Sequence, residues 1–149
     1  MAHEFPDITA YGSALRFALE AEQACADFAA AAGVVAPDQA WQDKLEEVVC
    51  THDDRVQKLT VARQEVSEGV LEPIHALHVK DYLGTLDAEP VTSWPAAAAQ
   101  LIQAEEDTAR YHEDFLTQCE KMLGGRARAF EKSAQQDRAY AAELREMLG

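Results

Sequence analysis

The chain has few cysteines, and none of them are spaced to share a metal ion. Its 149 residues include only Cys25, Cys50 and Cys119, which are odd in number and far apart. A disulfide framework needs an even set, and a zinc or rubredoxin-type cluster needs Cys-x-x-Cys spacing. We therefore interpret the three cysteines as small core or boundary residues of a protein in a reducing compartment.

Long hydrophobic runs and positive charge are also scarce. No stretch approaches the roughly 18 apolar residues of a membrane-spanning helix, and residues 1–7 lack the basic and apolar regions of a signal peptide. The 27 acidic residues outnumber the 13 Lys and Arg, which gives a net charge of −14. Such a field repels phosphate backbones and anionic lipids. We expect a cytoplasmic protein that binds neither nucleic acid nor membrane.

Several enzyme fingerprints are missing as well. The sequence contains no phosphate loop, dinucleotide fingerprint or nucleophile motif, which disfavours hydrolase, kinase and Rossmann chemistry. Its hydrophobic content of 48%, rich in alanine, is typical of closely packed helices. At this length we expect residues 1–149 to form a single domain.

Apolar residues recur at helical spacing in four segments. The expected helices cover residues 8–32, 38–68, 93–123 and 126–148. Gly33 and Pro37 separate the first two, and Gly124 with Gly125 separates the last two. Because these connections are short, each pair of helices should form an antiparallel hairpin.

A long crossover, residues 69–92, joins the two hairpins. Pro73, Gly84 and Pro90 punctuate it, and the apolar stretch at 74–83 predicts a short helix within it. The predicted fold class is therefore all-α, a four-helix bundle of two antiparallel hairpins joined by a crossover that contains a short helix. This is the ferritin-like topology.

Polar side chains interrupt the apolar stripes of all four helices. They are Glu22, His52, Glu105, His112, Asp137 and Tyr140. Burying an ionised carboxylate without a partner costs several kcal/mol, so these acids require cations, protons or a metal. Carboxylate and imidazole ligands from facing helices hold iron or manganese in such bundles. The alternative is that the acids are protonated, or paired with the His and Tyr side chains.

Two of these acids share a further pattern. Glu22 and Glu105 are each followed six residues later by an aromatic residue, Phe28 and Tyr111. In this the chain resembles the ferritin-like superfamily, nearest to its rubrerythrin branch, over residues 10–148. That family holds two metal ions with one glutamate on each of the first and third helices and a Glu-x-x-His pair on each of the other two. The resemblance implies that Glu22 and Glu105 are metal ligands.

The paired positions depart from the family pattern. The second helix has Val49-x-x-His52, where valine replaces the glutamate, and the fourth has Asp137-x-x-Tyr140, where a phenol replaces the imidazole. Valine offers no donor atom, and tyrosine is a poor ligand unless it is ionised. These changes disfavour a symmetric di-iron centre and leave a single-metal or asymmetric site open.

Helix geometry suggests a substitute for the missing histidine. At 1.5 Å per residue, Glu105 lies roughly 27 Å from the turn at Gly124, whereas Asp137 lies about 16 Å from it. His112 matches Asp137 in height better than Glu105 does. We therefore hypothesise that His112 joins the site from a neighbouring helix.

The resemblance implies a protein that binds non-haem iron, or another divalent metal, and that reacts with peroxide or oxygen or holds iron. Tyr140 would bond to a ligand or donate one electron. Because the chain has no rubredoxin-like Cys₄ segment, electrons would come from a separate protein, and we expect a homodimer. The alternative is a metal-free, degenerate ferritin-like bundle that acts as a structural or protein-binding module. Val49 and Tyr140 favour that alternative, whereas the retained acids argue against it.

Overall fold

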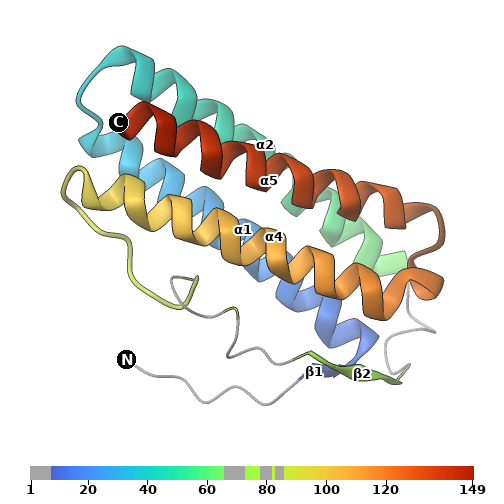
Figure 1. Cartoon of the computed structure of the whole chain (residues 1–149). Helices are drawn as coiled ribbons and strands as arrows, with labels where there is room; N and C mark the ends of the chain where they lie inside the picture. The colour runs from blue at the N-terminus through green and yellow to red at the C-terminus, as the bar shows by residue number, and fades with distance from the viewer. Residues whose placement is uncertain (1–7, 66–72, 78–81, 83–85) are drawn as a thin grey trace.

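The computed structural model describes residues 8–65, 73–77, 82 and 86–149. Four long helices run side by side as a bundle (Figure 1). They are α1 (Tyr11–Val35), α2 (Gln39–Glu65), α4 (Ala96–Leu123) and α5 (Ala127–Leu148), with the 3₁₀ turn η1 (Gly124–Arg126) between the last two. Helix α1 packs against α2 and α4, and α4 packs against α5. The predicted bundle of four long helices is confirmed.

The helix boundaries follow the local signals of the sequence. The Asp38 side chain accepts a hydrogen bond from the Trp41 amide at 2.9 Å and so caps the start of α2. At the end of α4, Gly124 adopts a φ of 55°, the left-handed conformation that glycine tolerates without steric cost. The chain can therefore turn directly from α4 into α5. Residues 66–68, which were expected to extend the second helix, lie outside the described residues.

A small antiparallel sheet replaces two expected helical segments. Strand β1 (Ile8–Ala10) pairs with β2 (Pro73–Leu77), and Ile8 lies opposite Leu77. The sheet lies against α1 and α4 at one end of the bundle (Figure 1). The short helix predicted over residues 74–83 is therefore wrong for 74–77, and residues 78–81 and 83–85 lie outside the described part. Pairing provides partners for backbone groups on the facing edges of the two strands, and Ile8 and Leu77 are buried.

The core has two apolar clusters, one on each side of a polar layer. The first includes Leu15, Phe17 and Phe115, and the second includes Leu45 and Leu101. On each long helix, one predicted polar residue lies between the residues of the two clusters: Glu22, His52, Glu105 and Asp137. His112 lies next to Tyr111, at the edge of the first cluster. The packing that stabilises the bundle therefore also holds this layer away from water.

Candidate metal centre

All five predicted metal ligands meet in this polar layer. Glu22, His52, Glu105 and Asp137 are 0% exposed, and His112 is 1% exposed. They come from α1, α2, α4 and α5. The stripe positions that helical periodicity assigned to these residues are therefore interior positions, and whether they bind a metal stays a prediction.

His52 lies between two carboxylates. Its Nδ1 hydrogen-bonds to Glu22 Oε2, and its Nε2 lies 2.6 Å from Glu105 Oε1. Burial alone would lower the pKa of His52, but the negative charge of Glu105 and the hydrogen bonds to Glu105 and Glu22 raise it to about 10. At neutral pH, His52 is therefore an imidazolium that donates from both ring nitrogens.

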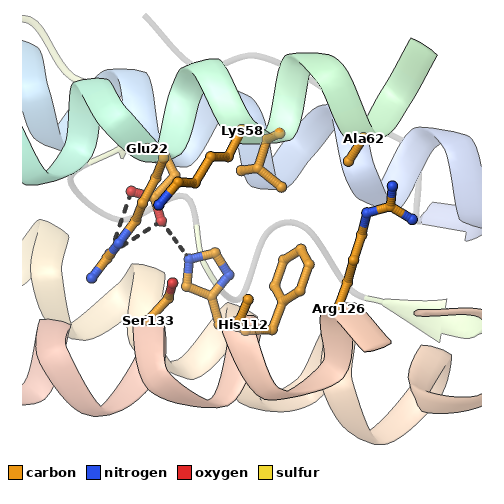
Figure 2. A pocket seen from close by; sticks show the side chains of 10 residues that line it. Glu22, Lys58, Ala62, His112, Arg126 and Ser133 are labelled. Carbon is orange, nitrogen blue, oxygen red and sulfur yellow. Dashed lines mark hydrogen bonds and ion pairs between the residues drawn. The ribbon is translucent and has the colours of Figure 1, made fainter. Parts of the chain in front are cut away.

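His112 approaches the same glutamate from another helix. Its Nε2 lies 2.6 Å from Glu22 Oε1 (Figure 2). The same nitrogen lies 3.9 Å from Asp137 Oδ2. Burial would raise the pKa of Glu22, but the hydrogen bonds from His112 and His52 hold that pKa well below its ordinary value. Glu22 is thus an ionised carboxylate with an imidazole on each oxygen. The hypothesis that His112 joins the layer agrees with this placement.

Arg55 is a member of the layer that the sequence analysis missed. Its Nη1 lies 2.5 Å from Asp137 Oδ1 and 3.3 Å from Glu22 Oε1, and its side chain is only 12% exposed. Arg55 follows His52 by three residues, so the two share one face of α2. That spacing was the available signal, because a cation beside an inward histidine can reach the same acids.

Asp137 carries the opposite pKa shift from Glu22. Burial and the charges of Glu105 and Glu22 raise the pKa of Asp137 well above its ordinary value, although Arg55 and His52 act to lower it. Asp137 therefore holds a proton more readily than an ordinary aspartate does. Two buried cations and one proton can offset the three buried acids without any other partner.

Two sets of donor atoms lie close enough together to hold a metal ion. Glu22, His112 and Asp137 form one set, and Cys25, His52 and Glu105 form the other. In each, the donor atoms lie within 4.8 Å of one another.

The chemistry of the donors separates the two sets. In the second, both nitrogens of His52 are taken by carboxylates, and burial raises the pKa of the Cys25 thiol well above its ordinary value. Neither group is a ready ligand, since metals bind thiolate and neutral imidazole. Each set has a buried carboxylate oxygen without a hydrogen-bond partner, Asp137 Oδ2 in the first and Glu105 Oε2 in the second. In the first set, His112 also has a free Nδ1, which can carry the ring proton when Nε2, the nitrogen that faces Glu22 and Asp137, binds a metal. Glu22, His112 and Asp137 therefore fit a divalent metal better than the other set does.

Tyr140 lies apart from these donors. Its hydroxyl is 2.8 Å from Thr51 Oγ1, and Lys44 Nζ lies 5.1 Å from the centre of its ring. Tyr140 belongs to the second apolar cluster, and the half-buried Val49 packs against that cluster. Both positions at which the chain departs from the family pattern are therefore built into apolar packing. The role predicted for Tyr140 stays a prediction.

A cavity reaches the polar layer between α2 and α5. It has a volume of about 240 Å³, and Glu22 and His112 are among its lining residues (Figure 2). Leu59 and Phe130 give it apolar walls. A small molecule in this cavity would lie directly beside the Glu22, His112 and Asp137 donor set.

Comparisons with known proteins do not assign the site. No family model matches the chain, and no curated protein or solved structure matches it. The ferritin-like resemblance therefore stays a prediction from the residues themselves. Among the described residues, no helix is both long enough and apolar enough to cross a membrane.

Proposed function

We propose that the bundle binds one divalent metal ion, with non-haem iron as the first choice, through Glu22, His112 and Asp137. The observation that carries the proposal is the close approach of three buried donor atoms, within 4.8 Å, beside a cavity. Two carboxylates and one imidazole suit iron or manganese. Three protein ligands next to a cavity leave coordination positions open, as catalytic metal sites require.

Charge argues for one metal ion rather than two. His52 and Arg55 already place two cations among the three buried carboxylates. A second divalent ion would have to displace Arg55 or take the proton from His52, and Val49 supplies no donor in place of the family's glutamate. The proposed site is thus an asymmetric, single-metal version of a ferritin-like centre.

Each side chain would have a separate task in this site. Glu22 and Asp137 would supply negative charge, and His112 would bind as a neutral imidazole. Arg55 would fix Asp137 by holding its Oδ1, which leaves Oδ2 for the metal. Bound iron supplies electron transfer to oxygen or peroxide, and the resemblance to rubrerythrins supports this activity. A homodimer and a separate electron-donor protein belong to the same proposal.

A metal-free bundle is the second candidate, and the same two cations favour it. His52 bonds to Glu22 and Glu105, and Arg55 bonds to Glu22 and Asp137. With a proton on Asp137, this network is neutral without a metal. In that case the polar layer would serve to fix the register of the four helices, and the chain would act as a structural or protein-binding module.

Metal content decides between the two candidates. The protein is purified without chelator, loaded with Fe(II) under anaerobic conditions, desalted, and analysed for metal per chain. We expect about one metal ion per chain. Glu22→Gln and Asp137→Asn should each abolish metal binding, because each replaces a negatively charged ligand with a neutral side chain of similar shape. Glu113→Gln is the matched control, since Glu113 is a half-exposed acid that pairs with Arg138. Its metal content should equal that of the wild type.

The outcomes separate cleanly. About two ions per chain would contradict the single-metal site. An absence of metal in a folded wild-type protein, with Fe(II) or Mn(II), would overturn the metal proposal and support the structural module. If metal binds, peroxide consumption by the iron-loaded protein tests the oxidoreductase activity, with Glu22→Gln as the inactive reference.

A further inference from the structure

The cavity between α2 and α5 opens on one side of the polar layer. On the other side of the layer, a hydrogen bond joins Thr51 to Tyr140 and an ion pair joins Lys44 to Glu143, so the two helices are tied together there. The cavity itself has a volume of about 240 Å³. An apolar cavity of about 150 Å³ accepts a benzene molecule. This cavity is therefore large enough for a benzene ring that carries a small substituent.

Apolar side chains from both helices form the walls of the cavity. Leu59 and Ala62 line it from α2, and Phe130 lines it from α5. All three are buried. The ring of Phe130 stacks on that of Phe115, with 4.8 Å between the ring centres, and this contact fixes its position. An aromatic ring in the cavity would remove this apolar surface from water and would gain further from contact with the Phe130 ring.

The charged residues that line the cavity already have partners. Glu22 accepts a hydrogen bond from Arg55, which joins it within the polar layer. Lys58 pairs with Asp54 at 2.8 Å, and its side chain is 76% exposed, so its charged end stays in water. Arg126 has an interaction partner as well. A ligand in the cavity therefore meets no charged group that lacks a counterion.

The placement of these charges disfavours ionic ligands of either sign. Lys58 and Arg126 lie at opposite ends of the cavity, so one compact anion cannot meet both (Figure 2). An anion would also lie near the ionised Glu22, and a cation would lie near Arg55. An ion of either sign would lose its hydration without gaining a new partner. The apolar walls and the paired charges together favour a neutral ligand.

We propose that this cavity binds a small neutral molecule with an aromatic ring, of about the size of toluene. The ring would contact Leu59, Ala62 and Phe130, and the polar layer would lie at one end of the ring. The charged residues at the rim would keep their present partners. Because the binding needs no metal, it is tested separately from the proposed metal site.

The test uses the full chain at neutral pH in the presence of a chelator and follows binding by titration calorimetry. The probes are toluene, the benzoate anion and the benzylammonium cation, which share one ring and differ in charge. We expect saturable binding of about one toluene per chain, with each ion weaker by at least about tenfold. An ion that binds within tenfold of toluene would overturn the assignment to a neutral ligand. An absence of saturable toluene binding up to its solubility would overturn the site.

Variants locate the binding. Ala62→Leu should fill the space and abolish toluene binding. Ala129 lines the same cavity but is exposed, so Ala129→Leu can narrow the opening without disturbing the core, and it should weaken binding by at least about threefold. Ala139→Leu is the matched control, because Ala139 is an exposed alanine of α5 outside the cavity.

The control should bind toluene as the wild type does. If Ala62→Leu does not fold, Ala129→Leu still decides. Wild-type affinity in Ala129→Leu, or an equal loss in Ala139→Leu, would contradict the proposed location. The metal content of the wild type is measured independently, so a failure of toluene binding leaves the metal proposal intact.

Discussion

Arg55 donates a hydrogen bond from its Nη1 to Asp137 Oδ1 at 2.5 Å and so joins α2 to α5 inside the polar layer. The same nitrogen lies 3.3 Å from Glu22 Oε1, so one guanidinium contacts acids from two helices. Buried charges are stable only when they are paired. Arg55 therefore supplies positive charge at the place where a metal ion would supply it.

Replacing Arg55 with methionine tests whether the charge of Arg55 and a bound metal ion stabilise the same two carboxylates, Glu22 and Asp137. In chelator, Arg55→Met should lower the free energy of unfolding by about 3 kcal/mol, because Glu22 and Asp137 lose their cation. Added Mn(II) should restore more stability in the variant than in the wild type, since the metal replaces the lost charge. Urea unfolding with chelator and with Mn(II) measures both effects.

Arg138→Gln provides the comparison for Arg55→Met. Arg138 pairs with Glu113 at 2.5 Å, but both side chains are about half exposed. Replacing Arg138 should lower the free energy of unfolding by less than about 1 kcal/mol, and the stability gained from Mn(II) should equal that of the wild type. If Mn(II) affects Arg55→Met no more than the wild type, Arg55 does not compete with a metal.

Tyr140→Phe tests whether the phenol takes part in the site. The hydroxyl of Tyr140 bonds to Thr51, so its removal should lower the free energy of unfolding by about 1 kcal/mol. Metal content per chain should stay at the wild-type value, because this contact lies outside the donor set of Glu22, His112 and Asp137. Thr51→Val removes the other partner of the same hydrogen bond, so its stability and metal content should match those of Tyr140→Phe. A loss of metal in Tyr140→Phe alone would identify the phenol as a ligand.

The three cysteines should differ in reactivity. Cys50 is exposed, whereas Cys25 and Cys119 are buried, and burial raises the pKa of Cys119 to about 11. Only a thiolate reacts quickly with a disulfide reagent. In the folded protein we expect the aromatic disulfide reagent DTNB to modify Cys50 alone, and all three thiols should react in urea. Cys50→Ser should remove the fast reaction, and a remaining fast thiol would contradict the burial of the other two.

Helical periodicity was sufficient to predict that the five proposed metal ligands lie inside. Glu22 and Glu105 fall on the apolar stripes of their helices, and a bundle of this kind has one interior for those stripes to face. The approach of His112 to Asp137 followed from the rise per residue along two adjacent helices. These predictions depend on local spacing, which the sequence contains directly.

Helical periodicity did not predict the position of Arg55 or the small sheet. Arg55 lies three residues after His52, and its long side chain reaches the core from the edge of that helix face. A pattern that counts apolar residues therefore passes over it, because a charged side chain is ordinarily assigned to the surface. Ile8 and Leu77 pair across a large separation in the chain, and such pairing depends on the tertiary structure. The apolar stretch after Pro73 fits a strand or a short helix equally well until its partner is known.

The pairing of His52 predicts a characteristic dependence of stability on pH in the metal-free protein. The folded protein holds the pKa of His52 at about 10, above its ordinary value of 6.5. A raised pKa means that the stabilisation is fully present below about pH 6.5 and is lost as the pH rises through 10. The raised pKa of Asp137 acts in the same direction, because its proton is also lost as the pH rises.

Stability should therefore fall steadily from about pH 7 to pH 10, with a slope that approaches 1.4 kcal/mol per pH unit. The lowered pKa of Glu22 has the opposite effect at acid pH, because its contribution to stability is lost as the pH falls and the carboxylate is protonated. In His52→Gln the alkaline slope should flatten, and stability at pH 6 should fall because two carboxylates lose their shared cation. Arg138→Gln should keep the wild-type slope. Urea unfolding in chelator across this range measures the effect, and an unchanged slope in His52→Gln would show that His52 is not an imidazolium between Glu22 and Glu105.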